Sequence, residues 1–155
     1  MKKKIVPALA GILMIASLTA CGASPEIAQF KKNMDEFCAS VAGINESINN
    51  INAEADNSAA LALEYLDQLN QQFQNFAAMD FPEEYDYLEN LADEAGEYMK
   101  EAVESYHKAY ADEGYDKETA AYARENSAQA FKRVQVILDI LHGKDPDTTP
   151  ENSEQ

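Results

Sequence analysis

The chain has 155 residues, and its 28 acidic residues outnumber the 12 basic ones to give a formal net charge of −16. Clustered Lys and Arg side chains are what attract phosphate backbones, so this balance argues against nucleic acid as a partner. The length suits a single domain, because domains of ~100–150 residues are the most common.

The N-terminal segment has the pattern of an export signal. Three lysines, Lys2, Lys3 and Lys4, precede a mostly apolar run from Ile5 to Thr19. A charged start, a short apolar core and small residues near its end are typical of a secretory signal peptide. The run is shorter than the ~20 apolar residues that a membrane-spanning helix needs. An uncleaved anchor helix with an incidental cysteine is the alternative interpretation.

The end of this segment, Leu18-Thr19-Ala20-Cys21, resembles the lipobox of bacterial lipoproteins, Leu-(Ser/Thr/Ala)-(Gly/Ala)-Cys. The resemblance implies cleavage between Ala20 and Cys21 and a diacylglyceryl thioether on Cys21. Residues 1–20 are then a lipoprotein signal peptide and residues 21–24 a lipidated cysteine with a short tether. The protein is expected on the extracytoplasmic face of the bacterial cell membrane, held by its lipid. Loss of the leader leaves 9 basic against 28 acidic residues, a formal charge of −19.

Lipidation would leave Cys38 as the one thiol of the mature chain, so no intramolecular disulfide could form. Cys38 follows Phe37 in a strongly periodic helical segment, which favours burial of the thiol. An intermolecular bridge is the alternative for a lone cysteine in an oxidising compartment.

The first two predicted helices have apolar residues spaced alternately three and four apart. The first runs from residue 25 to about residue 52, with Ser24 as its cap and Pro25 at its first position. The second begins within residues 53–58 and ends before Asp80-Phe81-Pro82. The first apolar seam comprises Ile27, Phe30, Met34, Phe37, Val41, Ile44, Ile48 and Ile51. The second comprises Ala59, Ala62, Leu66, Leu69, Phe73 and Phe76, with Leu63 alongside.

The third and fourth predicted helices have seams rich in alanine. The third is expected to start at Asp80-Phe81-Pro82, with acidic residues on its N-terminal dipole, and to end with Gly114 as the C′ residue. Asp116 is expected to cap the fourth, and Gly143 to stop it. The third seam comprises Leu88, Ala92, Ala95, Met99, Ala102, Tyr106 and Ala109, broadened by Tyr85, Leu91 and Tyr98. The fourth comprises Ala120, Ala123, Ser127, Ala130, Val134, Ile137 and Leu141.

Together these patterns predict an all-α fold, an antiparallel up-down-up-down four-helix bundle over residues 25–143. Residues 144–155, with Pro146 and Pro150 among polar residues, are predicted to be a disordered polar tail. Large side chains from the first two helices can interdigitate with the alanines of the last two. A long coiled-coil rod that dimerises is the rival architecture.

Two i, i+3 pairs, Glu104-x-x-His107 and Asp139-x-x-His142, have the spacing of metal ligands in ferritin-like bundles. A bundle would place them ~30 Å apart, and Glu104 falls off the seam, so no metal site is predicted. Met34 and His142 are nominal matches to haem ligands of four-helix cytochromes, with an axial mismatch of ~13 Å. Core packing for Met34 and a helix-dipole role for His142 are favoured, and no cofactor is expected.

The remaining candidate residues do not indicate a catalytic or metal-binding site. Seven tyrosines crowd the third and fourth helices, where edge packing is favoured and a groove for glycan or peptide is the alternative. The acidic loop 112–116 lacks the ligand order of a calcium loop and is interpreted as a helix stop and cap. No nucleophile arrangement, phosphate-binding glycine loop or Cys-x-x-Cys pair occurs, so we expect no catalytic residues and no enzymatic activity.

The expected function is therefore a non-catalytic binding or scaffold module. The mature part is similar to small helical-bundle surface lipoproteins, through its architecture and the Phe81-Pro82-Glu83-Glu84-Tyr85 segment. The membrane, reached through the lipid on Cys21, is one partner; an unidentified protein is expected at the distal loops, 52–58 and 112–116. Met79 and Phe81 are expected at the headgroups, with packing of Phe81 between helices as the alternative. A carrier of a small ligand, haem or metal inside the bundle is the alternative function.

Overall fold

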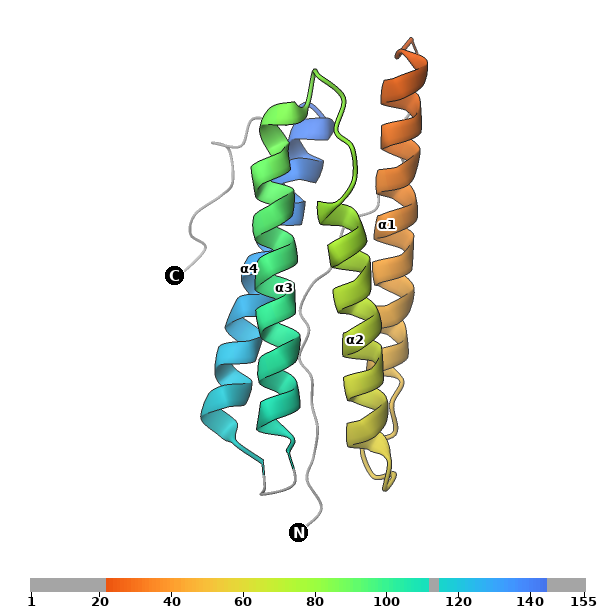
Figure 1. The fold of residues 1–155 in the computed structure, drawn as a ribbon. Coiled ribbons are helices and arrows are strands. Elements are labelled where there is room, and N and C mark those ends of the chain that lie inside the picture. The colour runs from red at the N-terminus through yellow and green to blue at the C-terminus, as the bar shows by residue number, and fades with distance from the viewer. Residues whose placement is uncertain (1–21, 112–114, 145–155) are drawn as a thin grey trace, which may run out of the picture.

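The computed structural model describes residues 22–111 and 115–144, and these ranges are all-helical with no strand. The helices are α1 (Pro25–Asn49), α2 (Ser58–Ala77), α3 (Glu89–Ala109) and α4 (Lys117–Leu141), with the short 3-10 helix η1 (Asp86–Leu88) before α3. Figure 1 shows the four long helices side by side, with the α2–α3 connection at one end of the molecule. The predicted all-α class and the number of helices in these ranges are confirmed.

Capping residues fix three of the helix ends where the sequence predicts them. The Ser24 hydroxyl accepts a hydrogen bond from the Ile27 amide at 3.3 Å, and Pro25 follows in the first turn of α1. Asp116 accepts bonds from the amides of Glu118 and Thr119 at the start of α4. Gly143 has φ +72°, a conformation that suits glycine after a helix end. The amides of Gly143 and Lys144 then bond back to the carbonyls of Ile140 and Asp139, which closes a Schellman motif.

The predicted start of the third helix is wrong by several residues. Residues 83–85 form a turn, with the Tyr85 amide bonded to the Pro82 carbonyl at 2.7 Å, and α3 itself begins at Glu89. Phe81 is buried against Phe30, with ring centroids 4.8 Å apart, and Tyr85 stacks on the same ring at 5.8 Å. Packing of these rings holds the segment in turns, although proline and acidic residues there are good local signals for a helix. The burial of Phe81 also favours its packing between helices over contact with headgroups.

The predicted end of the third helix is also wrong. α3 ends at Ala109 with Tyr110 as its cap, and Gly114 lies outside the described residues. The Asp116 amide donates to the Ala109 carbonyl at 2.9 Å, and the Tyr110 and Tyr115 rings lie 5.0 Å apart. These contacts bring the start of α4 against the end of α3. The chain therefore leaves the helix before the glycine.

One half of the core, next to the α2–α3 connection, is built from interlocking aromatic rings; we call it the aromatic half. Phe37 stacks on Phe76 with centroids 4.5 Å apart and meets Phe73 edge-on at 5.4 Å. Phe73 in turn meets Phe131 of α4 edge-on at 5.4 Å. These rings are 0–7% exposed, so α1, α2 and α4 share one apolar cluster. Offset and edge-to-face pairs of this kind add ~0.5–1.5 kcal/mol each beyond area burial.

The other half, next to the α1–α2 and α3–α4 connections (Figure 1), contains the buried polar side chains; we call it the polar half. The α3 and α4 alanines in the core are almost fully buried and let these two helices pack most extensively. Their burial confirms the predicted phase of both seams. The buried polar residues of the described ranges are Asn45, Ser58, Ser105, Asn126 and Ser127. The buried seam alanines of α3 and α4 are Ala92, Ala95, Ala102, Ala109, Ala120, Ala123 and Ala130.

The α2 and α3 backbones approach closely at Gly96. A Cβ at this position would lie 3.0 Å from the Ala77 Cβ, and the Gly96 carbonyl accepts a bond from Gln74 Nε2 at 2.9 Å. Glycine permits this spacing because it has no side chain. The contact fixes α3 against the C-terminal part of α2, the same part that lines the pocket described next.

Candidate functional site

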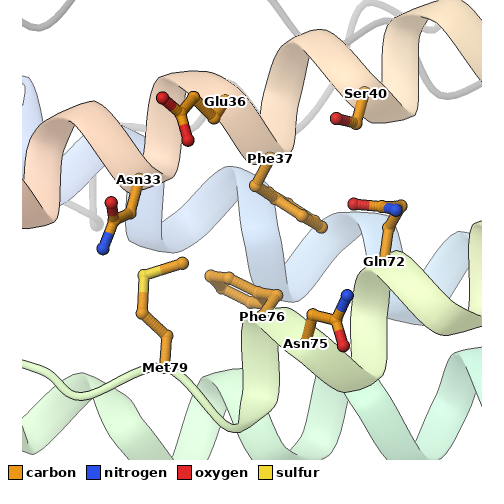
Figure 2. A pocket seen from close by; sticks show the side chains of 8 residues that line it. All are labelled: Asn33, Glu36, Phe37, Ser40, Gln72, Asn75, Phe76 and Met79. Carbon is orange, nitrogen blue, oxygen red and sulfur yellow. The ribbon is translucent and has the colours of Figure 1, made fainter.

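A surface pocket of about 350 Å³ lies between α1 and α2 in the aromatic half. Its volume falls within the ~300–1,000 Å³ of small-ligand sites. The stacked rings of Phe37 and Phe76 form its floor and are 5% and 1% exposed. Figure 2 shows Asn33 and Met79 on one side of this ring pair and Gln72 and Asn75 on the other.

The rim of the pocket is built from amides, one hydroxyl and one carboxylate. The Oδ1 atoms of Asn33 and Asn75 are engaged, because they accept bonds from Gln29 and Gln71 at 2.8 and 2.9 Å. These bonds run along the helices, four residues apart, and they orient each amide while leaving its Nδ2 group to donate. The Gln72 side chain makes no hydrogen bond or ion pair within the described part of the chain, and neither does the Ser40 side chain on the facing helix.

The charge of the pocket is small for so acidic a protein. Glu36 is the one ionisable residue among the lining side chains, and its Oε1 lies 3.5 Å from the Lys32 ammonium. Both side chains are about two-thirds exposed, so solvent screens the pair. The pocket therefore presents hydrogen-bond donors and acceptors together with one carboxylate, that of Glu36.

The residues that the sequence singles out for lipidation and cleavage, Ala20 and Cys21, lie outside the described residues. The described part begins at Gly22, two residues before the Ser24 cap. Lipidation of Cys21 stays a prediction.

The two residues of the first metal-type pair, Glu104 and His107, do not face a common site. His107 Nε2 lies 2.7 Å from Asp67 Oδ1 on α2, while Glu104 is exposed. The His107–Asp67 contact joins α2 and α3 at the surface, where both side chains are about half exposed. Across the described ranges, no group of three or more His, Cys, Asp or Glu side chains is arranged to hold a metal ion.

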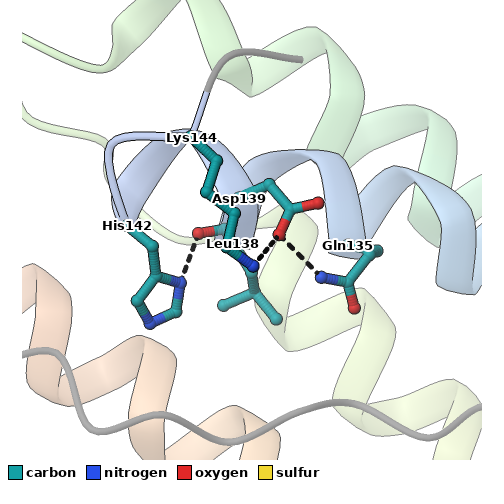
Figure 3. A network of polar contacts seen from close by, with 5 residues as sticks. All are labelled: Gln135, Leu138, Asp139, His142 and Lys144. Atoms are coloured by element: carbon teal, nitrogen blue, oxygen red, sulfur yellow. Dashed lines mark hydrogen bonds and ion pairs between the residues drawn. The ribbon is translucent and has the colours of Figure 1, made fainter. Parts of the chain in front are cut away.

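The second pair takes part in closing the end of α4 (Figure 3). His142 Nδ1 lies 2.6 Å from the Leu138 carbonyl oxygen, which is the contact expected for a residue at a helix C-terminus. Asp139 Oδ1 accepts bonds from Gln135 Nε2 at 3.0 Å and from Lys144 Nζ at 3.1 Å. Met34 is fully buried in the core cluster. These contacts place His142 at the C-terminus of α4 and Met34 in the core, the positions on which the helix-dipole role of His142 and the packing role of Met34 depend.

The tyrosines of α3 and α4 are spread over several environments, although the rings of Tyr110 and Tyr115 contact each other. Tyr98 lies under the Arg133 guanidinium at 5.3 Å, and the Tyr122 hydroxyl donates to Glu101 on α3. Tyr87 is 59% exposed, whereas Tyr106 is buried. Burial raises the pKa of Tyr106, with the nearby Arg124 opposing that shift. The edge-packing interpretation fits Tyr98, while Tyr106 packs inside the core.

Cys38 is 2% exposed, as its position next to Phe37 predicts, and it forms no disulfide within the described residues. Burial raises the pKa of the Cys38 thiol to about 11, and the Asp35 carboxylate adds to the shift. A protonated, buried thiol is a poor nucleophile and a poor metal ligand. Cys38 is therefore a packing residue of the hydrophobic core.

The pocket residues were not among the sequence-predicted sites. A signal for them exists in Gln71-Gln72-Phe73-Gln74-Asn75-Phe76, where amides alternate with seam phenylalanines. Such a run places an amide face beside an apolar stripe on one helix. The position of Asn33 and Ser40 opposite this face depends on the pairing of α1 with α2, which periodicity alone does not specify.

No helix in the described ranges is long and apolar enough to cross a membrane. Comparison of the chain with models of protein families, with curated proteins and with solved structures finds no match in any of the three.

Proposed function

We propose that this chain is a membrane-anchored, extracytoplasmic lipoprotein whose antiparallel up-down-up-down bundle is a non-catalytic binding or scaffold module. The observation that carries the proposal is the sequence Leu18-Thr19-Ala20-Cys21 at the end of a charged and then apolar leader. Two acyl chains on Cys21 would give stable anchoring, since each buried methylene contributes ~0.8 kcal/mol.

The short tether determines how the bundle would sit. Gly22, Ala23 and Ser24 separate Cys21 from the first residue of α1, a reach of about 10 Å at ~3.3–3.6 Å per residue. The first turns of α1, and with them the aromatic half and its pocket, would then lie near the bilayer. The α1–α2 and α3–α4 connections would face away, where the acidic residues Glu54 and Asp56 are available to a partner protein.

The alternative function, a carrier of a small ligand, haem or metal within the bundle, has less support. Met34 is packed in the core, and His142 Nδ1 is engaged by the Leu138 carbonyl. The pocket between α1 and α2 lies at the surface rather than inside the bundle.

Fractionation of cells expressing Cys21→Ala tests the anchor. We expect this variant in the soluble extracytoplasmic fraction or as an uncleaved precursor, while the matched variant Cys38→Ala stays in the membrane. Quantitative retention of Cys21→Ala in the membrane with normal processing would contradict the proposal.

Photocrosslinking in intact cells tests the partner face. A crosslinker at exposed Asp56, on the α1–α2 connection, should capture one recurrent protein, whereas a crosslinker at exposed Glu83 near the opposite end should not. Equal capture at the two positions would remove the support for a partner at the distal loops.

A further inference from the structure

We propose that two copies of this chain exchange α1, so that α1 of each copy packs on the α2–α4 unit of the other. This inference goes beyond the proposed binding function and does not depend on the lipid anchor. Three observations carry it: the kind of contacts that hold α1, the composition of the α1–α2 connection, and the phase of the apolar seam across that connection.

The contacts that hold α1 in the bundle are apolar. Its closest backbone packing is with α2, and Figure 1 shows α1 at the edge of the molecule beside that helix. Within the described residues, the side-chain hydrogen bonds and ion pairs of α1 stay within α1 and its cap. Its ties to the rest of the chain are ring contacts, such as Phe30 on Phe81 at 4.8 Å and Phe37 on Phe76 at 4.5 Å.

The other three helices are joined by polar side chains as well. Gln74 Nε2 of α2 donates to the Gly96 carbonyl of α3 at 2.9 Å. Arg133 Nε of α4 donates to Glu94 Oε2 of α3 at 2.6 Å. Release of α1 breaks neither of these bonds, so α2, α3 and α4 can stay together while α1 leaves.

A buried polar group on α1 lowers the cost of releasing this helix. Asn45 is 9% exposed, and its Oδ1 has no hydrogen bond among the described residues. When α1 leaves the core, water can bond to this oxygen, which offsets part of the apolar contact that is lost.

The α1–α2 connection, residues 50–57, contains no residue that would prevent a helix. It has neither glycine nor proline, and alanine and glutamate at positions 53–55 are good helix formers. In the closed chain, local bonds make the turn. The Ala55 amide donates to the Asn52 carbonyl at 3.0 Å, and the Glu54 amide donates to Asn52 Oδ1 at 3.0 Å. The connection can therefore straighten once the bonds to Asn52 are lost.

The apolar seam keeps its phase across this connection. Apolar residues continue at helical spacing through Ile48, Ile51, Ala55, Ala59 and Ala62. A straightened chain would form one helix over residues 25–77, ~80 Å long at 1.5 Å per residue. Its α1 and α2 parts would present their apolar faces on the same stripe. One copy can then keep its α2 on its own α3 and offer its α1 to a second copy.

The surface that α1 leaves is complementary to α1 itself. It contains the rings of Phe73, Phe76 and Phe81, which contact Phe30 and Phe37 of α1. A second copy supplies the same two rings at the same spacing, so exchange restores every contact and changes only the connection. Exchange of an identical element is for this reason a low-cost route to a dimer.

Disulfide trapping between two differently tagged full-length copies tests the exchange. One copy carries Ser40→Cys on α1 and the other carries Gln72→Cys on α2, at positions that line the two helices of one pocket. Exchange brings residue 40 of one copy to residue 72 of the other, so oxidation of the co-expressed proteins should link the two tags. Both substitutions in one chain should give an internal disulfide, which checks the geometry.

A matched pair on α2 and α3 is the control. His107 Nε2 lies 2.7 Å from Asp67 Oδ1, and exchange of α1 leaves these two helices in the same copy. Asp67→Cys and His107→Cys should therefore bond within one chain and should not link two copies.

Two variants of the connection should shift the exchange in opposite directions. Ala53 is exposed, its amide makes no backbone hydrogen bond among the described residues, and it follows Asn52 in the turn, where proline is favoured. Ala53→Pro therefore fits the closed chain but breaks the long helix, and it should lower the yield of linked copies about tenfold or more. Asn52→Ala removes the acceptor of the turn and favours a helix, and it should raise that yield about fivefold.

Light scattering of the unchanged protein in detergent gives a second measurement, and it should show a dimer that Ala53→Pro lacks. Three outcomes would overturn the exchange. They are a monomer at every concentration, equal linkage of the control pair between copies, or the same yield of linked copies from Ala53→Pro. Each leaves the proposed function standing, because fractionation of Cys21→Ala tests the anchor separately.

Discussion

The aromatic half and the polar half of this bundle differ in the side chains that fill the space between the helices. In the aromatic half, Phe37, Phe73 and Phe131 interlock across three helices. In the polar half, buried Asn126 and Ser127 bond to carbonyls of their own helix, at Tyr122 and Ala123. Large rings fix helices against one another, while local bonds satisfy a polar group without specifying a neighbour.

The polar half also contains two buried polar atoms without a hydrogen bond among the described residues, Asn45 Oδ1 and the Tyr106 hydroxyl. Ser127 neighbours the Tyr106 hydroxyl, and its own hydroxyl donates to the Ala123 carbonyl at 3.1 Å. An unsatisfied buried polar group costs ~1–3 kcal/mol. From this comparison we expect that stability is concentrated in the aromatic half, where the pocket also lies, and that the polar half can be stabilised by substitution.

The largest effect should come from removing a ring of the aromatic half. Phe73 is fully buried and contacts both Phe37 and Phe131 edge-on. Phe73→Ala should lower the free energy of unfolding by ~3–5 kcal/mol through lost burial and a cavity. Urea unfolding followed by circular dichroism measures this, with exposed Gln68→Ala as a control expected within ~0.5 kcal/mol of the unchanged protein. A loss below 1 kcal/mol would show that the aromatic half is not where stability is concentrated.

A smaller loss is expected from enlarging an alanine in the α3–α4 contact. Ala102 is fully buried, and Ala102→Leu should destabilise the protein by ~1–3 kcal/mol through overpacking. Ala121, exposed on α4, offers the matched change, and Ala121→Leu should be nearly neutral because leucine is a good helix former. Similar thermal midpoints for the two variants would mean that α3 and α4 are not held at a spacing set by alanine.

A modest gain is expected from removing an unsatisfied group in the polar half. Asn45 is 9% exposed with its Oδ1 buried. Asn45→Leu replaces the amide by an apolar side chain of similar size and should raise the free energy of unfolding by ~1 kcal/mol. Exposed Asn49→Leu, on the same helix, tests whether any gain is merely one of helix propensity. Destabilisation by Asn45→Leu would show that Asn45 has a partner, such as an ordered water.

A further effect should appear only at alkaline pH. Burial, with Tyr115 beside it, raises the pKa of Tyr110 to about 12 from its ordinary value of 10.0. The unfolded chain ionises Tyr110 near pH 10 while the folded chain keeps it neutral. The stabilisation is therefore complete below pH 10 and is lost as the pH rises toward 12.

Urea unfolding at pH 9 and pH 11.5 checks this. Tyr110→Phe should lose less stability over that interval than the unchanged protein, whereas Tyr87→Phe, at a position 59% exposed, should follow the unchanged protein. The same loss in all three proteins would assign the alkaline effect to other groups.

The sequence by itself determined the helices and their buried faces. Alternating spacings of three and four place one face of each helix in the core, and the almost complete burial of Phe73, Ala102 and Val134 follows from that phase. Ser24 and Asp116 cap their helices because the bonds involved reach two or three residues along the chain. These features depend on local geometry, so local patterns suffice to predict them.

Tertiary contacts decided the rest. Pro82 and its acidic neighbours favour a helix start locally. Because Phe81 and Tyr85 pack on Phe30 of α1, α3 begins only at Glu89. The Asp116 amide donates a hydrogen bond to the Ala109 carbonyl, and α3 ends there, before the predicted end at Gly114. The pocket needs Asn33 and Ser40 to face Gln72 and Asn75, from segments far apart in the chain. The faces by which two helices pair depend on the packing of all their side chains together, so they cannot be predicted from the local sequence pattern of either helix.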